Sequence, residues 1–152
     1  MNHYVTPQIG EIYLMRFGGE GSEQSGLRPG LVFQNNTGNL HSPNIIALPI
    51  TSSLKKAGQP THVILHAYDT GLKRDSMVLC ENPECISKLK IGKYITTLSG
   101  KYMRQIAEAS LLATSAISYL DVDLLRSIWE RASDLNRSGA GGVLYVQRGF
   151  EE

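Results

Sequence analysis

Short apolar segments separated by turn-forming residues fill the first eighty positions of the chain, and this pattern restricts the fold more than any other feature. Glu11–Phe17 mixes β-branched, aromatic and apolar side chains as strands do, and a glycine-rich stretch then interrupts it. Four further short segments are bounded by Pro, Gly, Asn or Ser: Leu31–Gln34, Asn44–Ile50, His62–His66 and Met77–Cys80. Closely spaced short strands are typical of small barrels, so this part is predicted to be β.

From Ser99 onward the apolar residues recur with a helical period. Ser99 is a plausible N-cap for one helix over about residues 100–118. Asp121 can cap a second helix, for which Gly139 is the expected end. The apolar stripe of this second helix needs a surface to cover, and it consists of Leu124, Leu125, Ile128, Trp129, Ala132 and Leu135.

These patterns together predict a mainly β fold with α (α+β), a small barrel followed by C-terminal helices. Its length and its 41% of hydrophobic residues suit an ordinary single core. Residues 1–119 are expected to form the main domain, and residues 120–152 a helical extension packed on it. The tail segment Val143–Phe150 could add an edge strand or stay disordered.

Several classes of protein are not expected. No stretch approaches the roughly 18 consecutive apolar residues of a membrane span, and the first ten residues do not resemble a signal peptide, so a soluble, cytoplasmic protein is expected. Cys80 and Cys85 lack a second pair or a histidine at zinc-ligand spacing, so no metal is expected. Neither a P-loop nor a DNA-reading helix pair is present, and no cofactor is predicted.

Charge is distributed unevenly along the chain, although the total is only +1. Residues 1–119 carry eleven Lys/Arg and eight Asp/Glu, whereas residues 120–152 carry four and six. The first part is therefore the better candidate for binding a polyanion. Lys55-Lys56 and Lys73-Arg74 could follow a nucleic-acid backbone, or they could simply be solvated turn residues.

One arginine and one hydroxyl residue stand at positions where strands meet loops. Arg28 lies where a glycine-rich loop enters a strand, and Pro29 fixes the backbone just after it. Thr51 ends an apolar strand at the start of three consecutive hydroxyl residues. Taken singly, Arg28 could be a surface arginine and the hydroxyl residues could be turn formers. Together they could hold a phosphate by charge-assisted hydrogen bonds.

Several motifs in order resemble the MazF/PemK family of toxin endoribonucleases. They are G-E-I-Y in the first strand, G-S-E-Q-S-G-L-R-P-G-L-V-F-Q-N, S-P-N-I-I-A-L-P-I-T, P-T-H-V and G-L-K-R-D-S-M-V-L. The resemblance extends from about Gly10 to Ile117, roughly three quarters of the chain. It implies an SH3-like barrel, a homodimer with single-stranded RNA across the subunit interface, and a cognate antitoxin that occupies the same groove.

The resemblance also implies roles for particular residues. Arg28 and Thr51 correspond to the family's catalytic pair. Asn82 is not among the matched positions, but it could read a base edge through its own amide. The resemblance implies that six other residues face or flank RNA: Ser22, Glu23, Gln24, Asn35, Lys56 and Thr61. These assignments rest on the matched motifs and not on spacing or periodicity.

The residue types at these positions suit metal-independent RNA cleavage. The ribose 2′-OH attacks the adjacent phosphorus and leaves a 2′,3′-cyclic phosphate and a 5′-OH. Arg28 can stabilise the developing charge and donate a proton to the leaving oxygen, because it stays protonated, but it is a poor base. The group that deprotonates the 2′-OH is not identified; His62 is a rival base, although it is read as a structural residue at the start of a strand.

Two segments depart from the family pattern. Residues 81–85 read E-N-P-E-C where relatives usually have E-Q-I-R-T, so Glu84 replaces an arginine and the cleavage preference does not carry over. Residues 119–152 extend past the usual family end and are expected to pack across the barrel or the dimer seam.

The sequence therefore supports two functions of different classes. The leading one is the toxin of a type II toxin–antitoxin system, an mRNA interferase that cuts single-stranded RNA at a short sequence. The alternative is a non-catalytic binder similar to CcdB that acts on DNA gyrase. Arg28 and Thr51 favour the enzyme, because a gyrase binder would not need them.

Overall fold

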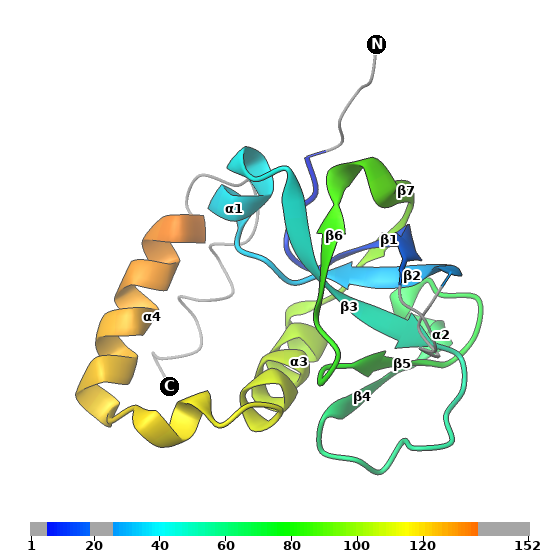
Figure 1. The fold of residues 1–152 in the computed structure, drawn as a ribbon. Coiled ribbons are helices and arrows are strands. Elements are labelled where there is room, and N and C mark those ends of the chain that lie inside the picture. Colours follow the sequence, from blue (N-terminus) through cyan, green and yellow to red (C-terminus); the bar gives the residue numbers. More distant parts are fainter. Residues whose placement is uncertain (1–5, 19–25, 137–152) are drawn as a thin grey trace.

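The strand-rich part of the chain forms an antiparallel sheet of seven strands, and the longer helices follow it in sequence (Figure 1). This computed structural model describes residues 6–18 and 26–136. The spatial order is β4-β5-β3-β2-β1-β7, and β6 pairs with β3 outside this path. The strands are β1 (Glu11–Phe17), β2 (Gly26–Val32), β3 (Asn44–Thr51), β4 (His62–Leu65), β5 (Ser76–Leu79), β6 (Glu84–Ser87) and β7 (Ile91–Thr97).

Helices occupy the connections and the C-terminal third. Two short helices lie between strands, α1 (Asn36–His41) and α2 (Ala67–Thr70). Two longer ones follow the sheet, α3 (Gly100–Leu112) and α4 (Val122–Asn136), and the 3-10 turns are η1 (Lys88–Lys90) and η2 (Ala116–Tyr119). The predicted α+β class with C-terminal helices is confirmed. Among the described residues the barrel is not closed, because β4 and β7 end the strand order without pairing with each other.

Strand β3 is the centre of the sheet. It pairs with β2 through Ala47, Leu48 and Pro49, with β6 through its first half, and with β5 through Ile50 and Thr51. Each of these neighbours contributes main-chain hydrogen bonds to the same eight-residue strand. The end of β3, where Thr51 lies, is consequently held by pairing with β5.

The sheet buries apolar side chains on both faces. One cluster lies between the sheet and α3, where Ile12 and Leu31 of the sheet and Ile106 of α3 are fully buried. The other cluster includes Met15 and Phe17, which alternate with Ile12 along β1 because successive strand residues point to opposite faces. Burial on both sides fixes the register, since a slip by one residue would exchange the two sets.

The first predicted helix ends earlier than expected. It was predicted over about residues 100–118, but α3 ends at Leu112 and η2 follows after a short break. The break contains Thr114, whose hydroxyl accepts a hydrogen bond from the Ala116 amide. Such local side-chain bonds compete with helical ones, which accounts for the interruption. Ser99 has the extended conformation of an N-cap, although its side chain makes no capping bond.

The second predicted helix is confirmed, with its cap. The Leu124 amide donates to the Asp121 carboxylate at 2.8 Å, as an N-cap requires. Helix α4 lies against α1, where the Thr37 hydroxyl donates to the Leu135 carbonyl. Part of its apolar stripe is open to solvent, because Leu124 and Ile128 are 41% and 37% exposed. Packing across the barrel or a dimer seam stays a prediction.

Two other expectations concern residues 137–152. The helix end at Gly139 and the edge strand Val143–Phe150 lie outside the described residues. Within the part that is described, no helix is long and apolar enough to cross a membrane.

The two cysteines are expected to react very differently in the folded protein. Cys80 is buried and Cys85 is exposed, and neither forms a disulfide. Burial, with a smaller contribution from Glu81, raises the pKa of the Cys80 thiol to about 11. At pH 8 a thiol reagent should therefore modify Cys85 alone, and Cys80 only after unfolding.

The same shift gives a pH dependence of stability. Because the folded-state pKa of Cys80 is the higher one, the unfolded chain ionises first, and the free energy of unfolding should fall between about pH 9 and pH 11. Cys80→Ser should remove this part of the pH dependence in urea titrations. An unchanged profile in the variant would show that another group is responsible.

Candidate active site

Arg28 and Thr51 are brought together by the antiparallel pairing of β2 and β3. The register pairs Gly30 with Pro49. Arg28 precedes Gly30 by two residues on β2, and Thr51 follows Pro49 by two residues on β3, so both residues lie at the same end of this strand pair. The two residues also line one common cavity of about 630 Å³.

The cavity is strongly cationic. Among the described residues that line it, none is acidic and four carry a positive charge: Arg28, Lys73, Arg74 and Lys93. Apolar side chains line the rest of the wall, among them Leu14 of β1 and Ile50 of β3. Low-dielectric walls strengthen the field of fixed charges, so the cavity favours an anion such as a phosphate.

Both members of the central pair have hydrogen-bonding capacity for a ligand. The Thr51 hydroxyl accepts a hydrogen bond from the Ser53 amide at 3.1 Å, which orients it and leaves its own hydrogen to donate. Arg28 is half-buried in β2, and no ion pair within the described residues engages its guanidinium. A charged fork and a hydroxyl donor thus face one space.

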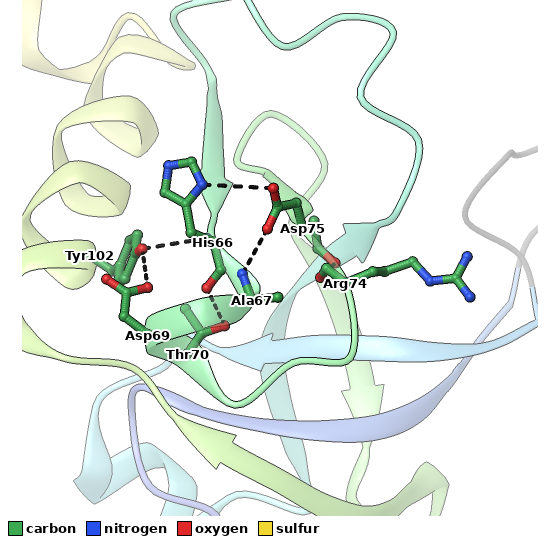
Figure 2. Close-up of polar contacts among 8 residues, drawn as sticks. His66, Ala67, Asp69, Thr70, Arg74, Asp75 and Tyr102 are labelled. Carbon is green, nitrogen blue, oxygen red and sulfur yellow. Dashed lines mark hydrogen bonds and ion pairs between the residues drawn. The ribbon is translucent and has the colours of Figure 1, made fainter.

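Arg74 reaches the cavity from a turn that side chains hold in place. The Asp75 carboxylate accepts from the Ala67 amide at 2.8 Å, and its other oxygen lies 3.9 Å from His66 Nδ1. The Ser76 hydroxyl donates to the Arg74 carbonyl at 3.0 Å. Figure 2 shows the Arg74 side chain extending away from these contacts. The network therefore fixes the backbone of Arg74 while its guanidinium is left for the cavity.

A second set of contacts anchors the same region to α3. The Tyr102 hydroxyl donates to the Asp69 carboxylate at 2.5 Å and accepts from the His66 amide at 3.4 Å (Figure 2). Burial first, and then the Asp69 hydrogen bond, raises the pKa of Tyr102. Tyr102 keeps its proton, so α2 and the turn after it are tied to α3 by a neutral donor.

The other residues predicted to bind RNA have separate positions. Ser22, Glu23 and Gln24 lie outside the described residues. Asn35 caps α1, where its side chain accepts from the Gly38 amide at 2.9 Å. Lys56 is exposed on the loop that leaves Thr51.

Thr61 comes directly before β4 in the sequence, and Asn82 comes shortly after β5. The Thr61 carbonyl accepts from the Cys80 amide at 3.0 Å, and the Asn82 amide donates to the Leu79 carbonyl at 3.2 Å. Asn35, Lys56, Thr61 and Asn82 do not line the cavity, and their RNA contacts stay predictions.

Sequence reasoning gave Arg74 only as a backbone-following residue and missed Lys93 altogether. Lys93 lies in β7, a strand whose sequence I-G-K-Y-I-T-T contains glycine, lysine and only two aliphatic residues. The alternation of lysine, isoleucine and threonine was the available signal, and it is weak beside the clear apolar runs.

Glu84, the acid that replaces an arginine of the family pattern, is not part of the cationic cavity. It lies in β6 and pairs with Ala47 of β3. Burial raises the pKa of its carboxyl group, an effect that the charge of Lys90 opposes. The replacement therefore does not place an acid among the residues that surround Arg28.

No group of three or more metal-ligating side chains occurs in the described ranges. The polar side chains that line the cavity are cations and hydroxyls, a set that suits an anion better than a metal ion.

Comparison with known proteins gives a consistent set of relatives. Residues 8–112 match the family described as PemK-like, MazF-like toxin of type II toxin-antitoxin system. The chain is 40% identical over 99 residues to Endoribonuclease EndoA of Bacillus subtilis, covering 65% of this chain and 85% of that protein. It is 38% identical over 101 residues to Endoribonuclease MazF of Staphylococcus saprophyticus, covering 66% and 84%.

A solved structure shares the fold. It is an endoribonuclease in complex with its cognate antitoxin from a mycobacterial species, with a TM-score of 0.60 and 25% identity over 70% of this chain and 93% of that one.

Proposed function

Because the chain belongs to the family of PemK-like, MazF-like toxins of type II toxin–antitoxin systems, we propose that it is an endoribonuclease that cleaves single-stranded RNA. The observation that carries the proposal is the shared cationic cavity of Arg28 and Thr51. The relatives that match are named endoribonucleases, which favours this function over the gyrase-binding alternative.

The cavity's residues divide the chemistry between them. The ribose 2′-OH attacks the adjacent phosphorus, the bond to the 5′-oxygen breaks, and a 2′,3′-cyclic phosphate and a 5′-OH result. Arg28 places donors where negative charge develops on the phosphoryl oxygens, and the Thr51 hydroxyl orients the same phosphate. Arg28 can then give a proton to the leaving oxygen. The remaining cations suit the flanking phosphates.

This scheme assigns the chemistry to side chains, and it can be tested directly. Purified protein is incubated with a long RNA of mixed sequence in excess EDTA, and the new ends are mapped. Cyclic phosphates at recurrent sites are the expected result. Intact RNA, or ends with 3′-hydroxyl groups, would contradict the proposal.

The partners in this proposal are a cognate antitoxin and a second copy of the chain, and the proposed localisation is the cytoplasm, where an mRNA substrate is present. Support for the antitoxin comes from the related structure that contains one. The homodimer follows from the family resemblance, and light scattering of the purified protein tests it. A monomer at micromolar concentration would remove the subunit interface from the proposed RNA path.

Arg74→Ala is expected to lower the cleavage efficiency, kcat/KM, by about tenfold or more, because hydrogen bonds to charged groups contribute about 1.5–3 kcal/mol. The guanidinium lines the same cavity as the catalytic pair. Arg104→Ala, an exposed arginine of α3 outside the cavity, is the matched control and should cleave like the wild type. Equal rates for both variants would remove Arg74 from the site.

A further inference from the structure

His62 is a buried histidine with both ring nitrogens engaged, and the proposed reaction does not use it. Its side chain is only 3% exposed. Nδ1 lies 2.7 Å from the Lys56 carbonyl oxygen, and Nε2 lies 2.7 Å from Oε1 of Glu81. Two short contacts on one buried ring define a fixed orientation.

The Lys56 partner determines where one ring hydrogen lies. A carbonyl oxygen can only accept, so Nδ1 carries a hydrogen and donates to it. Nε2 faces Oε1 of Glu81, whose side chain is 34% exposed. Both ring nitrogens are thus engaged within the protein, which argues against the ring as the base that was considered from the sequence. His62 also does not line the cavity.

These contacts join two connections that are far apart in sequence. The Lys56 carbonyl belongs to the loop between β3 and β4, and Glu81 belongs to the turn after β5. The same carbonyl also accepts from the Gln59 amide at 3.3 Å, so the His62 bond fixes a turn in the middle of the loop. The loop leaves β3 at Thr51, and the Lys56 side chain on it is exposed.

We propose that His62 is a positioning residue that holds the Lys56 turn so that the Lys56 ammonium meets an RNA phosphate next to the cavity. The inference rests on the proposed function, because it needs an RNA strand that passes Thr51. The ring acts through its Nδ1 hydrogen bond, and the contact of Nε2 with Glu81 keeps it oriented. His62 itself touches no reacting atom.

Two replacements separate the two bonds of the ring. The amide nitrogen of asparagine reaches about as far from Cβ as Nδ1, so His62→Asn can keep the bond to the Lys56 carbonyl. The amide nitrogen of glutamine reaches about as far as Nε2, so His62→Gln can keep the bond to Glu81 but loses the bond to the Lys56 carbonyl. The inference predicts that the asparagine variant binds RNA more like the wild type than the glutamine variant does.

The readout is the salt dependence of binding by the full-length protein. The probe is an RNA of the cleaved sequence with a 2′-O-methyl group at the cleaved position. Each phosphate contact on a single strand contributes about 0.7 to the slope of log K against log salt. Lys56→Ala should lower the slope by about that amount, His62→Gln should lower it in the same direction, and the double variant should match Lys56→Ala.

A general loss of stability would not change this slope, and unfolding curves confirm that each variant is folded at the temperature used. His41→Gln, the same change at an exposed histidine of α1, should leave the slope unchanged. A wild-type slope in His62→Gln, or additive losses in the double variant, would overturn the inference. Failure of the wild-type protein to cut RNA would instead overturn the proposed function.

Discussion

Arg28→Ala is expected to reduce the rate of RNA cleavage by about 10²–10³-fold, with little change in fold. The guanidinium lines the cationic cavity beside Thr51, where the proposed reaction develops negative charge on the phosphodiester. Removing one preorganised donor from such a position typically has an effect of this size. The measurement is single-turnover cleavage of a defined RNA in excess EDTA, with circular dichroism to establish that the variant is folded.

Two comparisons make the result specific. Arg28→Lys keeps the positive charge but loses the planar pair of donors, so most of the rate should still be lost. Arg16→Ala changes an exposed arginine of β1 that does not line the cavity, and it should cleave normally. Full activity in Arg28→Ala, or an equal loss in Arg16→Ala, would contradict the assigned role.

Phe17→Ala is expected to lower the free energy of unfolding by about 3–5 kcal/mol, the usual range for a buried phenylalanine. Phe17 is 2% exposed and belongs to the cluster on the Met15 face of the sheet. Its ring approaches Gly30 so closely that a Cβ there would lie 2.7 Å from the ring. Urea unfolding followed by circular dichroism measures the effect.

The size of the loss should follow the volume removed. Phe17→Leu leaves a smaller cavity and should be less destabilising than Phe17→Ala. Leu27→Ala, at an exposed leucine of β2, should change stability by less than about 0.5 kcal/mol. Similar losses in all three variants would show that the ring of Phe17 does not support the sheet. Because Phe17 packs under β2, activity of the alanine variant should decline at lower temperature than that of the wild type.

The elements that could be predicted from the sequence are those whose buried apolar residues recur at regular spacing. Strand β1 has the predicted bounds, β3 and β4 differ from the predictions by one residue at one end, and β5 is shifted by one residue at both ends. Asp121 was recognised because its capping bond is local. The strand predicted at Leu31–Gln34 begins earlier, at Gly26, because pairing with β1 extends it through Arg28 and Pro29.

Strands β6 and β7 could not be identified from local pattern. Each is short of apolar residues and is stabilised by pairing with a distant strand, β6 with β3 and β7 with β1. Helix α1 was missed for a related reason. It consists of six residues, N-T-G-N-L-H, and it depends on the cap provided by Asn35, a residue that was predicted only to contact RNA.

The candidate site likewise contains residues that could be predicted from local sequence and residues that could not. The proximity of Arg28 and Thr51 followed from motifs at strand ends, and the pairing of β2 with β3 supports it. Arg74 and Lys93 reach the same cavity from a turn and a strand separated by almost twenty residues. Nothing local in the sequence indicates that these two segments meet, because the meeting depends on the order of strands in the sheet.

The position of β3 also determines how the protein should lose its activity on heating. Amide protons of a strand hydrogen-bonded along both edges exchange with solvent through the rarest, global openings, whereas those of peripheral helices exchange through local ones. Ala47 pairs with β2 on one edge and with β6 on the other, so deuterium uptake in this part of β3 should be among the slowest in the molecule. Thr51 ends the same strand. Inactivation by heat should then coincide with global unfolding instead of preceding it.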